Sequence, residues 1–364
     1  MIAGLLLLAF FCQCLWVAQT RHLSDVEFSY LAATHASRQG EQSPITSPFT
    51  VLAASLPLRV TNVLRRTGPS ALRATLAVPR TWVLRLPFVI FGLWLGAALW
   101  WVARRLFGDE GGYIALALYC FSPAMVEISS NIAPEIILAW SSFGLIYAAI
   151  GVAHTVYSPP RKWPPRIVLL GLSMGIAVST TLWACTLVLL AFVFMFYLAP
   201  GRRRAALFVF ACAAGVGVVV FAITTWLTGS GIVAFRALIT PRLSWELLKN
   251  LGSFALSERS DGYGLVALFI VVFTAYGSWK RARYFGNSAP LLTAFAVVFL
   301  VSLVPALQLW PAALGVSFLF LFVGGVMADL LETGSRRWFL WIIMAAGAIK
   351  VVEDLKLLRW WVHQ

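Results

Sequence analysis

The chain has 364 residues, of which 60% are hydrophobic and only 12% are charged. Soluble globular proteins have about 45–50% apolar and about 25% charged residues, so this composition excludes a soluble domain. Lys and Arg exceed Asp and Glu by 28 to 14, for a net charge of +14. In a membrane protein such an excess collects in cytoplasmic loops and beside anionic headgroups, so we expect a lipid bilayer and no nucleic acid as partner.

Apolar runs close to the length of about 20 residues that spans a bilayer recur along the whole chain. The first run, Met1–Ala18, has no Lys or Arg before it, so we interpret it as an uncleaved span, with a cleavable signal as the alternative. The expected fold class is all-α, with about eleven transmembrane helices. The later predicted spans are Leu86–Val102, Gly112–Glu127, Ile132–Val152, Val168–Val178, Leu182–Leu198, Ala205–Leu227, Leu265–Trp279, Ala289–Leu307, Ala312–Leu331 and Trp338–Val352.

The basic residues of the short connections predict the orientation of these spans. With a cytoplasmic N-terminus, the pairs Arg104–Arg105 and Arg161–Lys162 and the triplet Arg202–Arg204 all fall on the cytoplasmic side. The opposite short connections, Ser129–Asn131 and Gln308–Trp310, hold no basic residue. We therefore expect a multi-pass protein of a plasma (inner) membrane.

The same topology divides the chain into a membrane domain and a tail. The predicted domain covers residues 1–352, with two longer loops at the outer face, 20–85 and 228–264. The remaining residues, 353–364, carry Trp360 and Trp361 and are expected to form a short interfacial tail.

Cysteine and histidine spacing gives no sign of a metal or redox site. The five cysteines lie in apolar stretches without a C-x-x-C pair, and the four histidines are scattered. We expect neither disulfide, zinc nor another cofactor, and a requirement for a divalent metal stays open.

Acidic residues near a membrane are functional candidates, because a charge within a span costs about 2.5–3.5 kcal/mol. Asp25 and Glu27 directly follow the first span, and Glu127, Asn131 and Glu135 surround a later outer turn. A proline before Glu135 predicts a helix N-terminus there, where an anion is favoured. A plain helix-terminal charge for Glu135 and an interfacial carboxylate for Glu127 are the structural alternatives.

Arginines are the second feature of the outer segments. Four of them recur every seven residues among Leu, Val and Ala, as on short interfacial helices that prolines interrupt. They either contact headgroups or bind a specific lipid phosphate. The second outer loop adds Arg236 and Arg242, with Arg259 nearer its end. Its Gly and Pro content suits a mobile lid, an acceptor loop or a solvated connector. These residues are Arg59, Arg66, Arg73, Arg80, Arg236 and Arg242, with prolines at Pro57, Pro69 and Pro79.

Carboxylates and arginines at one membrane face suit chemistry on a lipid-linked phosphate. A carboxylate would take the proton of an acceptor hydroxyl, and arginines would hold the charge of a leaving polyprenyl phosphate. The same residue types would also serve an anion transporter, although we find no internal repeat of the kind that many transporters have.

Four short motifs in order carry a family resemblance: Leu84–Phe88, Val102–Gly108, Phe121–Pro123 and Ala133–Glu135. Together they resemble the membrane glycosyltransferases of the GT-C type, in particular the dolichyl-phosphate-mannose protein mannosyltransferase and aminoarabinose transferase group. The resemblance implies transfer of a sugar from a polyprenyl-phosphate donor to a lipid, glycan or protein acceptor at the outer face, with inversion at the sugar.

The resemblance also implies roles for individual residues. The family's Asp-Glu pair, followed three residues later by Tyr, falls on Val26–Tyr30, where Glu27 and Tyr30 fit and the Asp does not. Asp25 lies one residue early, so the choice of base between Asp25 and Glu27 stays open, while Glu135 would support the site or orient the donor. The expected substrate-binding residues are Tyr30, Arg59, Arg66, Arg85, Glu127, Asn131, Arg236 and Arg242.

Two departures from the family pattern keep other readings open. The His-Pro-Pro segment appears only as Thr46–Phe49, and the Lys after the fifth helix is replaced within Ser179–Trp183. An arginine such as Arg59, Arg236 or Arg242 would have to bind the phosphate, and Arg and Lys are not equivalent ligands. A non-catalytic family member and a transporter or lipid-handling subunit therefore remain alternatives.

Overall fold

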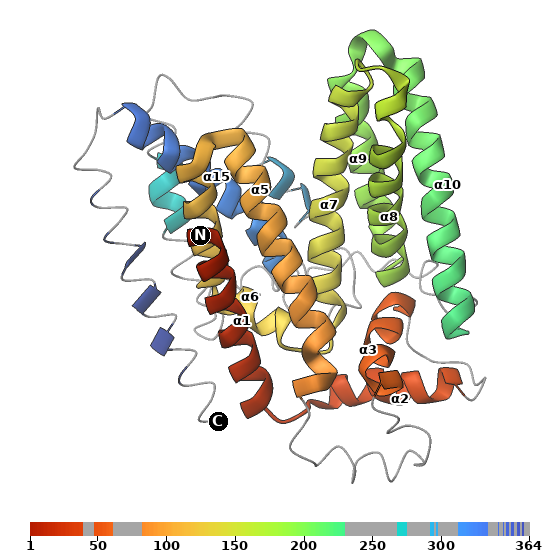
Figure 1. The fold of residues 1–364 in the computed structure, drawn as a ribbon, viewed down its shortest axis with the longest axis vertical. Coiled ribbons are helices and arrows are strands. Elements are labelled where there is room, and N and C mark those ends of the chain that lie inside the picture. The colour runs from red at the N-terminus through yellow and green to blue at the C-terminus, as the bar shows by residue number, and fades with distance from the viewer. Residues whose placement is uncertain are drawn as a thin grey trace, which may run out of the picture. The chain divides into compact units, whose positions relative to one another are not determined.

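The structure is a computed structural model that describes residues 1–38, 47–60, 82–229, 268–274 and 312–333, with short stretches within 292–297 and 341–359. It is built from helices, and no strand occurs within these ranges (Figure 1). The helices are α1 Ile2–Thr20, α2 Asp25–Arg38, α3 Pro48–Val60, α5 Trp82–Cys120, α6 Pro123–Ser129, α7 Pro134–Thr155, α8 Pro164–Thr180, α9 Ala184–Leu198, α10 Arg203–Thr228 and α15 Ala312–Thr333, with 3₁₀ turns at Pro160–Lys162 and Pro200–Arg202.

Five of the described helices are long and apolar enough to cross a membrane. They are α1, α5, α7, the helix Pro200–Thr228 that contains α10, and the segment Leu314–Glu332 of α15. The expectation of an all-α, multi-pass membrane protein is thereby confirmed, while the total of about eleven spans stays a prediction. Most of the spans expected between residues 265 and 352, apart from α15, lie outside the described residues, as do most of the second outer loop and the C-terminal tail.

The two spans expected between residues 86 and 127 differ from the prediction. They form α5, whose two helical segments meet at Gly108, where a φ of 83° favours glycine. The second segment ends at Cys120 and not at Glu127. Ser122 is extended because Pro123 follows it, and the chain then starts the short α6. Pro57 also departs from expectation, because it lies within the last turn of α3 and not between two helices.

The described helices form two compact units. The first comprises Met1–His22, Val89–Asn131 and Leu243–Gln364. In it α1 packs on α6 and on α5, where the ring of Phe10 lies 5.0 Å from that of Tyr119. The Tyr119 hydroxyl donates a hydrogen bond of 2.7 Å to the carbonyl of Gly92. Close backbone approach also joins α5 to α15, because a Cβ on Gly324 would lie only 2.8 Å from the carbonyl oxygen of Gly111.

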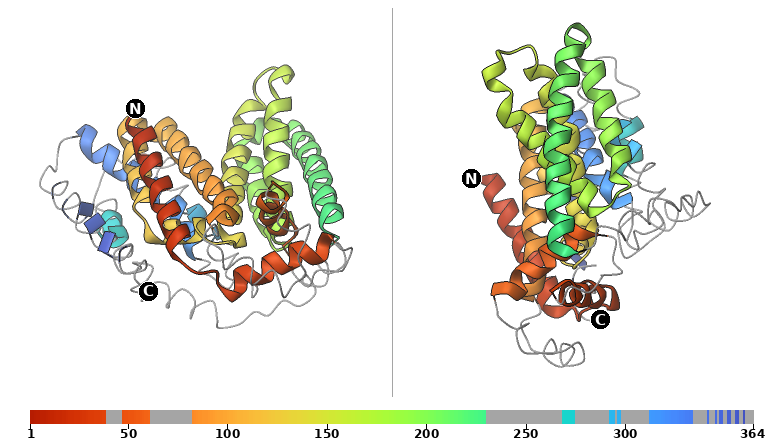
Figure 2. Two further views of the ribbon diagram at one scale, coloured as in Figure 1. Left: turned by 60° about the horizontal axis from the view of Figure 1, so that its bottom comes forward. Right: turned by 90° about the vertical axis from the view of Figure 1, so that its right-hand side faces the viewer.

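The second unit comprises Leu23–Phe88 and Ile132–Arg242. Its helices α7, α8, α9 and α10 form an upright bundle, and α2 and α3 lie at one end of it (Figures 1 and 2). Gly171 and Gly175, spaced as in the G-x-x-x-G motif of membrane helices, let α8 approach α10 closely. A hydrogen bond of 2.8 Å from Thr224 to Ser179 adds a polar contact between the same helices.

The contact between α8 and α10 makes a prediction about stability. A Cβ on Gly175 would lie 2.5 Å from the Cβ of Val220 and 2.8 Å from the carbonyl oxygen of Gly217, so Gly175→Ala would force the helices apart. Overpacking of this kind costs about 1–3 kcal/mol, and we expect a lower melting temperature in detergent. Gly215→Ala is the matched control, because no atom lies within 4 Å of its added Cβ. Equal melting temperatures for the two variants would contradict the prediction.

Candidate functional site

The start of α2 is organised by a capping box formed by Ser24 and Glu27. The Ser24 side-chain oxygen accepts the backbone N–H of Glu27 at 3.3 Å, and the Glu27 Oε2 accepts the backbone N–H of Ser24 at 2.9 Å. This exchange satisfies two N–H groups that the first turn of a helix otherwise leaves without partners. It fixes the beginning of α2, and with it the positions of the residues that follow.

Glu27 is also one half of a buried ion pair with Arg85. Its Oε1 accepts from Arg85 Nε at 2.8 Å and its Oε2 accepts from Arg85 Nη2 at 2.7 Å. The two side chains are only 3% and 1% exposed. Two parallel hydrogen bonds suit a planar guanidinium and a carboxylate, and pairing is what makes burial of both charges tolerable. The pair joins α2 to the first turn of α5.

A third contact joins the backbone just before α7 to the same carboxylate. The backbone N–H of Ile132 donates to Glu27 Oε1 at 3.0 Å. Burial alone would raise the pKa of Glu27, but the hydrogen bonds and positive charge of Arg85, with the N–H groups of Ser24 and Ile132, hold it below its usual value of 4.5. Glu27 is therefore ionised and fully engaged, which makes it a poor proton acceptor.

Glu135 and Tyr30 lie near each other in the same unit. Pro134 is the first residue of α7, so Glu135 lies in the first turn, as the sequence predicted, and is 2% exposed. Burial raises the pKa of Tyr30 well above its usual value, and the negative charge of Glu135 adds to that effect. The phenol of Tyr30 consequently stays protonated and is able to donate a hydrogen bond next to an acidic side chain.

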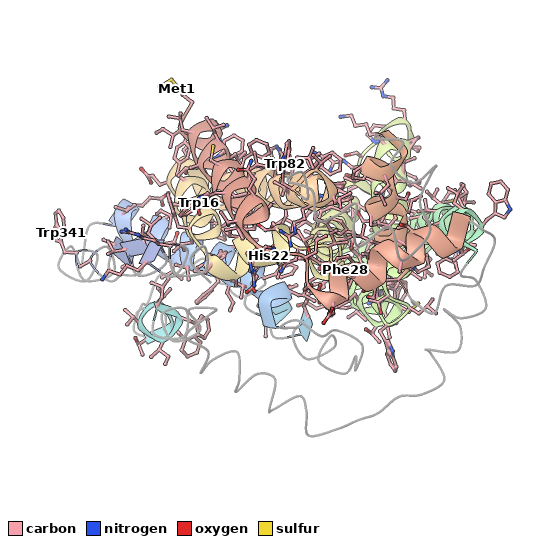
Figure 3. The ribbon with its side chains drawn as sticks, turned by 90° about the horizontal axis from the view of Figure 1, so that it is seen from below. Met1, Trp16, His22, Phe28, Trp82 and Trp341 are labelled. Atoms are coloured by element: carbon pink, nitrogen blue, oxygen red, sulfur yellow. The ribbon has the colours of Figure 1, made fainter. Side chains whose placement is uncertain are left out.

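Asp25 differs from these residues because it is exposed. It lies in the first turn of α2, two residues before Glu27, on the part of the helix that faces away from the unit's interior. Figure 3 looks onto this end from below, with Phe28 on α2 and Trp82 at the start of α5. Of the acids described at this end of the unit, Asp25 is the one with access to solvent.

The other predicted outer acid, Glu127, lies in the first unit. It accepts from Arg21 Nη1 at 3.3 Å, which ties the end of α1 to α6. Asn131 is half-buried in the turn after α6. The ion pair favours a role for Glu127 in holding the connection after α1.

Several expected site residues lie outside the described residues. Arg59 falls in the last turn of α3, but its side chain lies outside the described residues, as do Arg66, Arg236 and Arg242 entirely. The structure also shows partners that the sequence analysis missed: Ser24 and Ile132 bind Glu27, and Arg21 binds Glu127. The Ser24-x-x-Glu27 spacing is a capping-box signal and would have identified Ser24. Within the described ranges, no three His, Cys, Asp or Glu side chains gather as a metal site would require.

A family model described as dolichyl-phosphate-mannose-protein mannosyltransferase matches residues 70–227. The fold is similar to that of ArnT from Cupriavidus metallidurans bound to undecaprenyl phosphate, with 16% identity over 96% of this chain and 63% of that chain and a TM-score of 0.62. It is also similar to the archaeal oligosaccharyltransferase AglB from Archaeoglobus fulgidus in complex with an inhibitory peptide and a dolichol-phosphate. That match has 13% identity over 97% of this chain and 55% of that chain, with a TM-score of 0.54.

These similarities confirm the resemblance to GT-C membrane glycosyltransferases and show that the chain has their fold. A search of curated protein sequences gives no match. The chain spans less than two thirds of the length of ArnT. The family match begins at residue 70, so the acids of α2 lie outside it and their roles depend on the geometry above.

The buried pair makes a prediction about stability. Removing the guanidinium in Arg85→Met leaves Glu27 charged and buried, which we expect to cost about 3–5 kcal/mol. The double variant Arg85→Met/Glu27→Met should recover part of that loss, because two apolar side chains then replace the two charges. Melting temperatures in detergent for the complete double-mutant cycle provide the measurement. The control is Arg104→Met, because Arg104 pairs with Asp109 at an exposed site where a pair contributes about 0–1 kcal/mol.

Acid should weaken the same contact. The folded pKa of Glu27 is lower than its unfolded value, so its contribution to stability is complete above about pH 4.5 and is lost as the pH falls through the lower, folded pKa. We expect the melting temperature of the natural chain to fall below about pH 4.5 more steeply than that of Glu27→Gln. Parallel pH profiles for the two proteins would contradict the assignment.

Proposed function

We propose that the chain is a membrane glycosyltransferase that moves a sugar from a polyprenyl-phosphate donor to a hydroxyl acceptor at the outer membrane face. The observation that carries the proposal is the arrangement at the start of α2, where an exposed Asp25 stands beside a buried, ionised Glu27–Arg85 pair. The similarity to ArnT, whose structure holds undecaprenyl phosphate, supports the donor class. The acceptor would be a lipid, a glycan or a protein.

The proposed reaction is a direct displacement at the anomeric carbon. The acceptor oxygen forms a bond to that carbon while the bond to the phosphate oxygen breaks, and the electron pair leaves with polyprenyl phosphate. The acceptor proton passes to a carboxylate, which acts as general base. One displacement from the opposite side inverts the configuration at the sugar.

Asp25 is the better candidate for the base. A general base must reach the acceptor hydroxyl and must be able to take up a proton. Asp25 is exposed, whereas both oxygens of Glu27 already accept hydrogen bonds and its pKa is lowered. In this proposal Glu27 and Arg85 are positioning residues that hold α2, while the buried Glu135 and the nearby Tyr30 support the site.

This assignment changes the expected role of Arg85 in substrate binding. Its guanidinium is engaged with Glu27 and is 1% exposed, so it is poorly placed to receive a phosphate. The phosphate would then be bound by arginines of the outer segments, of which Arg59, Arg66, Arg236 and Arg242 are the candidates from the sequence.

We propose an inner-membrane location with a cytoplasmic N-terminus. In the first unit α1 runs antiparallel to α5, because Leu7 lies near Gly96 and Phe10 near Gly92. The N-terminal end of α1 thus points toward Arg104 and Arg105. Basic residues favour the cytoplasmic side, which supports this orientation.

Release of undecaprenyl phosphate by the purified full chain tests the proposal. The protein in detergent is incubated with a panel of undecaprenyl-phosphate sugars and a membrane-lipid extract as acceptor. We expect Asp25→Asn to slow release by about 10²–10⁴-fold, the usual contribution of a general base. Binding of undecaprenyl phosphate should stay unchanged, because the variant alters the base and not the phosphate contacts.

Asp109→Asn is the matched control, because it also removes the charge of one exposed aspartate. Asp109 lies in the first unit, where it pairs with Arg104. The control variant should release undecaprenyl phosphate at the rate of the natural chain. Equal rates for Asp25→Asn and the natural chain would overturn the choice of base. Binding of the donor without transfer to any acceptor would favour a non-catalytic member, and uptake of the lipid-linked sugar into liposomes without transfer would favour a transporter.

A further inference from the structure

The end of the second unit opposite α2 carries a cluster of basic residues. From residue 136 to residue 242 the sequence contains no Asp or Glu. Two turns close this end of the bundle, between α7 and α8 and between α9 and α10 (Figure 1). All Lys and Arg residues of the described part of this stretch belong to these turns or to the first turns of the helices that follow them. These are Arg161, Lys162, Arg166, Arg202, Arg203 and Arg204, and we call them the basic collar.

The two turns that carry the basic collar are tied to each other. The backbone N–H of Gly201 donates to the hydroxyl of Tyr157 at 3.3 Å, and Arg202 Nη1 donates to the carbonyl of Val156 at 3.0 Å. The indole N–H of Trp163 donates to backbone carbonyls of its own turn at 3.2 Å. Residues more than 40 positions apart thus present their charges from a fixed framework.

Aromatic rings orient the guanidinium groups of the collar. The guanidinium carbon of Arg202 lies 5.8 Å from the ring centre of Tyr157, and that of Arg203 lies 5.0 Å from the ring centre of Phe196. Arg161, Arg203 and Arg204 are exposed. The cations are therefore accessible to a ligand from outside the bundle.

An exposed apolar surface begins directly next to the collar. Along α9, Leu189, Val193 and Tyr197 are spaced four residues apart and are 63%, 55% and 73% exposed. Phe208, in the second turn of α10, is 61% exposed. A ligand that meets both surfaces needs an anionic head and apolar chains, and a phospholipid has both.

We propose that the basic collar is a binding site for the phosphate of an anionic phospholipid whose acyl chains lie along α9 and α10. The charge is complementary, because no acid of these helices competes for the cations. The site is separate from the acids at the start of α2 and does not depend on the proposed transfer reaction.

Binding of defined lipids to the purified full chain tests the proposal. Dioleoyl phosphatidylglycerol and dioleoyl phosphatidylcholine, which share acyl chains, are titrated in detergent and followed by native mass spectrometry. The tested variant is Arg203→Gln/Arg204→Gln, and the control is Arg104→Gln/Arg105→Gln, which removes the same charge from the first unit. Each basic residue near a lipid surface contributes enough to weaken binding about fivefold when lost, so we expect about 30-fold weaker phosphatidylglycerol binding in the tested variant and little change in the control.

Three results would overturn the proposal. The first is equal affinity for the two lipids, and the second is an equal loss of affinity in the two double variants. The third is binding of glycerophosphoglycerol, the headgroup without acyl chains, as tight as that of phosphatidylglycerol, which would indicate a site for free phosphodiesters. Melting temperatures in phosphatidylcholine check that the variants fold. If Arg203→Gln/Arg204→Gln is destabilised, Arg161→Gln/Lys162→Gln in the other turn repeats the comparison.

Discussion

The buried pair of Glu27 and Arg85 is the interaction on which the candidate site depends. Four hydrogen bonds reach one carboxylate, from a guanidinium, from the backbone of the α2 cap and from the backbone before α7. Three segments far apart in the sequence are joined by it. Because two charges buried at this depth are tolerable only when they remain paired, the arrangement has little freedom to change without loss of the fold around it.

The second unit has different chemistry at its two ends. The helices between them are held by small residues and hydroxyl contacts, which suit an environment in which apolar side chains gain little by leaving lipid. Acids gather at the end with α2, and basic residues gather at the other end. The bundle is therefore polarised along its length, with the proposed chemistry at one end and the proposed lipid contact at the other.

The sequence predicted the membrane class and most helix positions in the described ranges, because long apolar runs such as Ala205–Leu227 are governed by local composition. It also predicted that Glu135 lies near a helix N-terminus, since Pro134 favours a helix start there. It could not predict that Arg85 pairs with Glu27, because the two residues are 58 positions apart and only tertiary packing brings them together. The sequence analysis placed Glu127 at the end of a long span. In the structure Pro123 starts a separate short helix, and Glu127 in that helix pairs with Arg21.

The capping box also determines the direction in which Asp25 faces. Successive residues of an α-helix are rotated by about 100°, so side chains two positions apart differ by about 200° and lie on nearly opposite sides of the axis. Because Glu27 points into the unit, Asp25 points toward solvent. An acidic residue in place of Val26 would be rotated by only about 100° from Glu27. Displacement of the acid by one residue from the family's pattern thus turns its carboxylate by roughly a quarter of a circle, and any partner of Asp25 must approach α2 from its solvent-facing flank.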